Sequence, residues 1–147
     1  MPDVPVKDFW NSEGVQAHLT ITQSVIQRMA TNSASSKAWC VALVSAILVV
    51  VADKKQPDLA LIALLPIALF FVLDGYYLAL EKAFIAAYND FIDKLHQRKI
   101  DASDLYAIAP KGSLIWSFLR ALGSFSIWPF YCTLFALVLV TRTIVLK

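Results

Sequence analysis

The sequence predicts an all-α integral membrane protein with about three transmembrane helices, an amino-terminal amphipathic helix and a long cytoplasmic extension of the second span. Hydrophobic residues make up 59% of the 147 residues, charged residues only 16%, and the mean hydropathy is +0.63. The longest apolar segment, Leu59 to Leu80, contains one charge, Asp74. It has the roughly 20 residues that a helix needs to cross about 30 Å of hydrocarbon. A chain this short cannot bury three such segments, so their surface must face lipid or partner subunits.

The amino-terminal part is too polar to cross a membrane. Residues 1–11 carry two prolines and no apolar stretch typical of a secretory signal, which predicts an irregular arm. A helical period follows at Val15, Leu19, Thr22, Ile26 and Met29. We expect an amphipathic helix that lies along the membrane surface or packs on the cytoplasmic part. The turn-favouring Asn32–Ser36 should end it, which divides the chain into residues 1–34 and a membrane domain, residues 35–147.

The first two spans should form an antiparallel hairpin. The first covers residues 35–52, and Trp39 stands near its edge as an interface anchor. The polar turn 53–58 is so short that the second span, residues 58–80, must run back beside the first. Pro66 should kink this second span because it lacks a backbone donor.

The second helix should continue beyond the membrane. Asp74, Glu81, Ile85, Tyr88 and Ile92 follow one another at seven, four, three and four residues, which keeps them near one line of a helix. One helix is therefore expected from Asp58 to about Lys94.

The cytoplasmic extension and loop cover residues 81–124, with a short helical turn at 102–108 and an interfacial helix at Leu114–Leu122. The third span should occupy about residues 125–145 after the break at 123–126. A continuous helix from Leu114 to Val145 is the alternative.

The distribution of positive charge predicts the orientation. With the amino terminus inside, the 13 Lys and Arg residues divide nine to four in favour of the cytoplasm. The cytoplasmic set is Lys7, Arg28, Lys37, Lys82, Lys94, Arg98, Lys99, Lys111 and Arg120, and the other set is Lys54, Lys55, Arg142 and Lys147. Because cytoplasmic loops carry an excess of positive residues, we expect a cytoplasmic amino terminus and an outer carboxyl terminus.

Asp74 is the most informative single residue. A carboxylate inside a span costs about 2.5 to 3.5 kcal/mol on insertion scales, so it normally faces water, a basic partner or another subunit. One interpretation places Asp74 at the inner headgroup level, where it would only mark the membrane boundary. The other places Asp74, with Tyr76 and Tyr77, at a pore mouth or a contact between subunits. We expect no enzyme, no metal and no cofactor, because the sequence lacks phosphate loops, paired histidines and nucleophile motifs.

A basic cluster follows the second span. Lys94, Arg98 and Lys99 stand around His96, with Lys111 further on. The bias of positive residues toward the cytoplasm explains such a cluster by itself. The alternative is a site for an anionic ligand, in which Tyr88 and Tyr106 would offer stacking surfaces.

The strings HLTITQSVIQRMATNSASSKAWCVALVSA (18–46) and LDGYYLALEKAFIAAYNDF (73–91) resemble a group of small bacterial membrane proteins of anti-phage defence operons. These are short effectors encoded beside a nucleotidyltransferase, as in Hailong-type and related nucleotide-signalling systems. The resemblance covers about residues 15–95 and rests on helix-face residues.

The resemblance implies a homo-oligomeric channel in the bacterial inner membrane, with a tetramer as the expected assembly. A nucleotide or short oligonucleotide made by the partner nucleotidyltransferase would gate it, and its opening would depolarise the infected cell. In this hypothesis Asp74, Tyr77 and Glu81 line the pore, where carboxylate rings favour cations. The ligand would be bound by Arg28, Lys94, Arg98 and Lys99. The alternative is a non-conducting accessory subunit that recruits or stabilises a larger partner.

Overall fold

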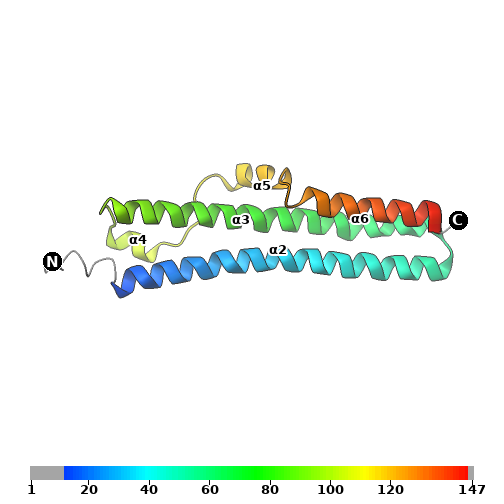
Figure 1. Cartoon of the computed structure of the whole chain (residues 1–147), viewed down its shortest axis with the longest axis horizontal. Helices are drawn as coiled ribbons and strands as arrows, with labels where there is room; N and C mark the ends of the chain where they lie inside the picture. The colour runs from blue at the N-terminus through cyan, green and yellow to red at the C-terminus, as the bar shows by residue number, and fades with distance from the viewer. Residues whose placement is uncertain (1–11, 146–147) are drawn as a thin grey trace.

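The computed structural model describes residues 12–145, with the side chains of Ala102, Ile144 and Val145 left out, and the predicted arm 1–11 lies outside this range. The described residues are mostly helical and contain no strand. Its elements are α2 (Glu13–Lys54), η1 (Pro57–Ala63, a 3₁₀-helix), α3 (Leu64–His96), α4 (Ala102–Tyr106), α5 (Leu114–Leu122), α6 (Trp128–Val140) and the π-helical turn η2 (Thr141–Val145) (Figure 1).

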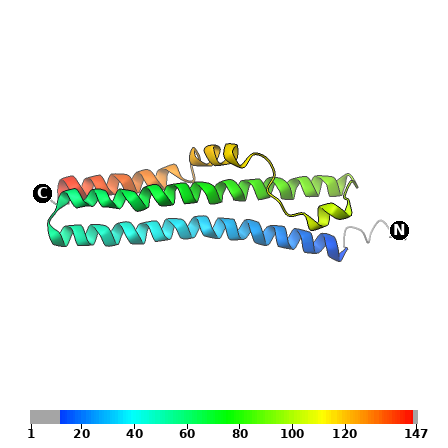
Figure 2. The same ribbon diagram turned by 180° about the vertical axis from the view of Figure 1, so that it is seen from behind.

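The fold is an elongated helical hairpin. Helices α2 and α3 lie side by side along their whole length, joined at one end by the turn at Lys55 and Gln56 (Figures 1 and 2). Lys55 adopts the left-handed conformation, with φ 53°, which ends α2 and reverses the chain. The 42 residues of α2 measure about 63 Å at 1.5 Å per residue, twice the thickness of a bilayer core.

A buried seam on α2 holds the hairpin together. Val15, Thr22, Met29 and Ser36 are buried and recur every seven residues. This spacing keeps one helix face toward a partner helix, as in coiled coils. Of the residues in the predicted helical period, Val15, Thr22 and Met29 are buried, and Leu19 and Ile26 are partly buried.

The expected helix break at Asn32–Ser36 is wrong, because α2 runs through it without interruption. The hydroxyl of Ser36 donates to the carbonyl of Asn32 at 2.9 Å, so its polar group is satisfied inside the helix. Ser33 donates instead across the seam to Asp74. Side-chain bonds and packing on α3 therefore override the turn preference of these residues, and the predicted boundary between residues 34 and 35 falls within one helix.

The predicted long second helix is confirmed, with one change of type. A 3₁₀-helix over Pro57–Ala63 leads directly into α3, which ends at His96. Pro66 is the third residue of α3 and cannot donate to the carbonyl four residues before it. The helix is therefore tighter just before the proline, and a kink at Pro66 stays a prediction.

The chain after α3 returns along the hairpin. Helix α5 has the predicted bounds, and α4 lies within the predicted turn at 102–108. Residues 123–127 separate α5 from α6, which excludes a continuous helix from Leu114 to Val145. Helices α5 and α6 both lie against α3, and the carboxyl-terminal end of α6 reaches the closed end of the hairpin (Figures 1 and 2).

Two helical stretches of the described chain are long and apolar enough to cross a membrane: Glu13–Lys54 and Pro57–His96. The predicted third span corresponds to a shorter apolar stretch, Trp128–Thr143. The main apolar core lies between these three at the closed end of the hairpin and includes Cys40, Val44, Ile67 and Val138. A second, smaller core at the open end contains Val15, Phe91 and Leu95.

Candidate functional site

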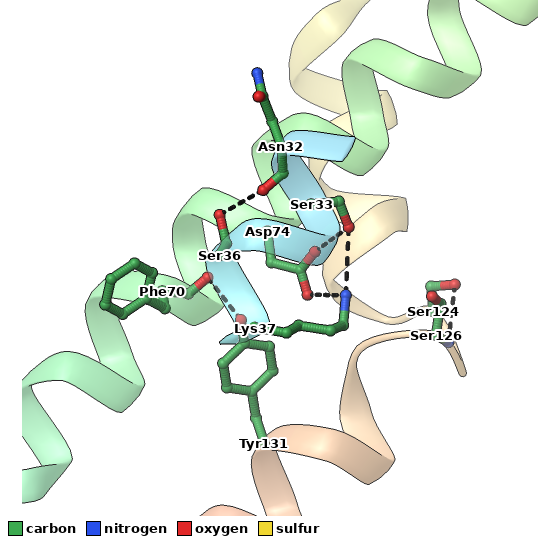
Figure 3. A network of polar contacts seen from close by, with 9 residues as sticks. All are labelled: Asn32, Ser33, Ser36, Lys37, Phe70, Asp74, Ser124, Ser126 and Tyr131. Carbon is green, nitrogen blue, oxygen red and sulfur yellow. Dashed lines mark hydrogen bonds and ion pairs between the residues drawn. The ribbon is translucent and has the colours of Figure 1, made fainter. Parts of the chain in front are cut away.

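Asp74 lies inside the hairpin, where α2 and α3 face each other. Its side chain is fully buried, with 0% of its surface exposed. Lys37 of α2 places its ammonium nitrogen 2.5 Å from Oδ2, and the hydroxyl of Ser33 donates to Oδ1 at 2.5 Å. Lys37 also donates to the hydroxyl of Ser33 at 3.3 Å, which closes a triangle of polar groups (Figure 3). The Asp74 carboxylate therefore has a basic partner within its own chain.

Helix α6 is joined to the same level of the hairpin. The hydroxyl of Tyr131 donates to the carbonyl of Phe70 at 2.9 Å, one turn of α3 before Asp74 (Figure 3). Tyr131 also packs edge-on against Phe71, with ring centroids 5.4 Å apart. The three apolar helices thus converge on one layer that contains the Lys37–Asp74 pair.

Helix α5 covers the residue next to Asp74. Gly75 is buried, and a Cβ atom built on it would lie 2.6 Å from a terminal carbon of Leu122 and 3.4 Å from the ring of Phe118. A side chain at position 75 would therefore require Leu122 or Phe118 to shift.

Exposed aromatic side chains surround this layer. Trp39 is two residues from Lys37, Tyr76 is two from Asp74, and Trp128 packs against Phe71. Exposed fractions run from 42% to 88% for Trp39, Tyr76, Trp116, Phe125 and Trp128. Exposed tryptophan and tyrosine side chains near this layer, such as Trp39, Tyr76 and Trp128, are typical of a membrane–water interface.

The other two predicted pore residues lie further along α3. Tyr77 and Glu81 are each partly buried, and the ring of Tyr77 contacts that of Tyr76 with centroids 5.9 Å apart. Within one chain, Asp74 is the only one of the three that is closed off from the surface. A role for these residues in a pore stays a prediction.

Three of the four predicted ligand residues lie at or just after the end of α3, and the fourth, Arg28, lies on α2. Lys94 lies near the end of α3 and forms an ion pair with Asp104 of α4 at 2.7 Å. Arg98 and Lys99 follow the end of α3 and are exposed, and Arg98 has a left-handed backbone with φ 57°. Arg28 is exposed on α2, ten residues and about 15 Å along the helix from His18.

Lys94 instead lines a cavity of about 270 Å³ at the open end of the hairpin. Helix α4 and the segment after it lie across α2 and α3 here (Figure 1). The polar side chains in its wall are His18, Thr22, Asp90, Lys94, Asp104 and Lys111.

The ion pair in this wall shifts the acidity of both partners. The hydrogen bond from Lys94 lowers the pKa of Asp104 below its ordinary value of 3.8. The same bond raises the pKa of Lys94 above 10.5. Both groups are therefore charged across the physiological range.

The sequence patterns identify no partner for the predicted site residues. Lys37 counts there only as a positive charge, and His18, Asp90 and Asp104 are not assigned to a site. A signal for Lys37 was present: it stands 18 residues before Lys55, and Asp74 stands 18 residues after Gln56. In an antiparallel hairpin, equal distances from the turn place two residues opposite each other.

Comparisons of the chain with protein-family models, curated proteins and solved structures gave no match. The class of protein is therefore defined by the fold alone: an all-helical chain with two long apolar helices of membrane-spanning length. Its candidate functional features are the ion pair of the buried Asp74 with Lys37 between those helices and a polar cavity at the open end of the hairpin.

Proposed function

We propose that this chain spans the bacterial inner membrane with its closed hairpin end and that four copies form an effector channel in anti-phage defence. A nucleotide or short oligonucleotide from a partner nucleotidyltransferase would gate the channel. The observation that supports insertion in a membrane is that three apolar segments have similar lengths. Exposed aromatic side chains near the Lys37–Asp74 pair lie at one end of these segments, and charged residues at the hairpin turn lie at the other.

The lengths of the three segments agree with one bilayer. The 18 residues from Lys37 to Lys54 of α2 and the 18 residues of α6 with η2 each rise about 26 Å. The 3₁₀ turns rise about 2.0 Å per residue, so Pro57 to Asp74 covers about 30 Å. At the closed end, Arg142 binds Asp58 at 2.7 Å, which joins α6 to the hairpin where headgroups would begin. A bilayer core of about 30 Å fits this zone.

The outward face of α2 supports assembly from several copies. It exposes Thr31, Ser35, Ala38, Ala42 and Ser45. Small residues let helices approach closely, and hydroxyl groups form hydrogen bonds between helices in lipid. Three spans are too few to enclose water, so conduction requires contacts of this kind around an axis.

In this proposal the described conformation is a closed state. Lys37 neutralises Asp74 and keeps the carboxylate inside the hairpin, away from any ion path. Opening would separate α2 from α3 at this level and turn Asp74 toward the axis, with Tyr77 and Glu81 below it. Ligand binding to the cytoplasmic half would supply the free-energy difference between the two states.

The test is the membrane potential of bacteria that express the chain, measured with a voltage-sensitive dye, alone and with the neighbouring nucleotidyltransferase gene. We expect depolarisation that depends on the partner gene and is reduced in Glu81→Gln. Asp93→Asn is the matched control, because Asp93 is exposed on the cytoplasmic part of α3. An unchanged potential in every strain, with the protein present in the membrane, would contradict the channel.

One observation favours the accessory subunit instead. The carboxylate that would line the pore already has a partner inside its own chain, as a structural ion pair would. A non-conducting subunit would use the exposed cytoplasmic hairpin to recruit a larger protein. It would run as a monomer or heteromer in detergent and leave the membrane potential unchanged.

A further inference from the structure

The cavity at the open end of the hairpin combines a ring surface with two lysines. Its wall is formed by α2, α3, α4 and the segment 107–111, and its volume is about 270 Å³. This is just below the range of about 300 to 1,000 Å³ that is usual for small-molecule sites. The cavity therefore suits a ligand no larger than a single nucleotide.

The ring surface is a stacked pair. The rings of His18 and Phe91 lie 4.0 Å apart with an interplanar angle of 22°, and both residues are buried. Nδ1 of His18 lies 3.1 Å from the carbonyl of Leu105, which fixes the orientation of the imidazole. A third ring entering the cavity would extend this stack, and stacking of a base on an aromatic side chain is favourable whatever the base.

Each lysine of the cavity wall forms an ion pair with an aspartate that another anion could displace. Lys94 pairs with Asp104, and Lys111 pairs with Asp90. The side chains of these four residues keep between 25% and 55% of their surface exposed, so water and salt weaken both pairs. A phosphomonoester carries nearly two negative charges and three acceptor oxygens, and it can compete for both ammonium groups.

We propose that this cavity binds a molecule that carries both a phosphomonoester and an aromatic ring, as a nucleotide does. The phosphate would replace Asp104 at Lys94 and Asp90 at Lys111. The ring would stack on His18 and Phe91. The inference rests on the proposed gating by a nucleotide and names its site, which differs from the predicted set in using Lys111 rather than Arg28, Arg98 or Lys99. The phosphomonoester belongs either to a free mononucleotide or to the end of an oligonucleotide.

Binding at this cavity would act on the membrane part through the strap 97–113. The strap is held by the Lys94–Asp104 pair, by the contact of His18 with Leu105, and by the Lys111 amide, which donates to the carbonyl of Ala83 at 3.2 Å. It leads directly into α5, which covers Gly75 beside Asp74. Loss of both carboxylate contacts would loosen the strap and with it the packing of α5.

Isothermal titration of the full chain in detergent micelles tests the site. The probes are 5′-AMP, 5′-GMP, 5′-CMP, 5′-UMP, a 5′-phosphorylated dinucleotide, and inorganic phosphate as a ligand without a ring. We expect saturable binding of the nucleotides and at least tenfold weaker binding of phosphate. Preference for the dinucleotide over AMP would assign the site to an oligonucleotide end, and the reverse preference to a free mononucleotide.

Substitutions of the two lysines and of the two aspartates should change the affinity for nucleotides in opposite directions. Lys94→Gln and Lys111→Gln should each weaken nucleotide binding about tenfold, which is the loss of one charge-assisted bond. Asp104→Asn and Asp90→Asn should strengthen it, because the competing charge is removed while the side chain can still accept a hydrogen bond. Lys82→Gln is the matched control, because Lys82 is exposed, lies outside the cavity wall and belongs to no predicted site. Circular dichroism of each variant checks that the helices are retained.

No saturable binding of any nucleotide would overturn the proposal, and so would lysine and aspartate variants that change the affinity in the same direction. The titration needs no ion current, so it is separable from the channel. Binding without depolarisation would retain the site and reject the channel, whereas depolarisation without binding would reject the site alone.

Discussion

The two residues of the Lys37–Asp74 pair differ in burial, and this difference decides how much each depends on the other. Asp74 is fully buried, whereas the side chain of Lys37 is 23% exposed. The long aliphatic part of a lysine allows its ammonium group to reach water or headgroups when the partner is lost. The carboxylate has no such route. Lys37 is therefore needed by Asp74 more than Asp74 is needed by Lys37.

Single and double substitutions test this asymmetry. Lys37→Met leaves the buried carboxylate with only the hydroxyl of Ser33, and we expect a loss of about 3 kcal/mol or more in the free energy of unfolding. Asp74→Asn should cost less. The double variant Lys37→Met with Asp74→Asn should be more stable than Lys37→Met alone, because it buries no charge. Unfolding in mixed micelles measures all three, and equal losses in the two single variants would contradict the argument.

We expect α4 to stay packed against α2 and α3 until the pH falls below the lowered pKa of Asp104. Lys94 lowers the pKa of Asp104, so this group stabilises the docked state above its ordinary pKa and loses that contribution only as the pH falls through the lowered value. We expect amide protection of residues 103–106 to stay constant from about pH 5 to about pH 9 and to fall below 3.8. Asp104→Asn should remove the acid transition. An acid transition that persists in Asp104→Asn would contradict this account.

At the scale of elements, the sequence predicted helices better than it predicted their ends and partners. Helix α5 was found with its bounds because Ser113 and Gly123 flank a short apolar run. The break expected in α2 was wrong because hydrogen bonds of Ser33 and Ser36, one of them to a helix distant in sequence, decide the local conformation. The cavity could not be predicted, since it depends on how α4 folds back onto α2.

The contact between α5 and α3 depends on the missing side chain of Gly75. We expect Gly75→Leu to push α5 away and to lower the melting temperature, because even a Cβ atom would meet Leu122 at 2.6 Å. Leu122→Ala in the same chain should restore part of the loss by making room. Gly14→Ala is the matched control, because its Cβ atom would have only an ordinary contact of 3.5 Å with Leu105. Thermal unfolding monitored by tryptophan fluorescence measures these effects, and an unchanged melting temperature in Gly75→Leu would show that α5 is not held by this contact.

At the scale of the whole molecule, the Lys37–Asp74 layer divides the hairpin into two halves of different character. The closed half has no charged residue within 38–52, 59–73 or 127–141. The open half contains the polar cavity, both of its ion pairs and the exposed Arg98 and Lys99. A membrane over the closed half would leave the open half in water, and in the proposed topology the excess of positive charge there would place it in the cytoplasm.

Labelling of single cysteines tests this orientation. In a chain with Cys40→Ala and Cys132→Ser, one cysteine replaces Lys55 at the hairpin turn or Lys99 beyond the end of α3, both of which are exposed. We expect a membrane-impermeant maleimide to label Lys55→Cys in spheroplasts with an intact inner membrane, and Lys99→Cys only after that membrane is permeabilised. The reverse pattern would place the cavity outside the cell, where a nucleotide made in the cytoplasm could not reach it. Labelling of both sites in intact spheroplasts would mean that the hairpin does not cross the membrane, so the orientation, the channel and gating from the cytoplasm all depend on this result.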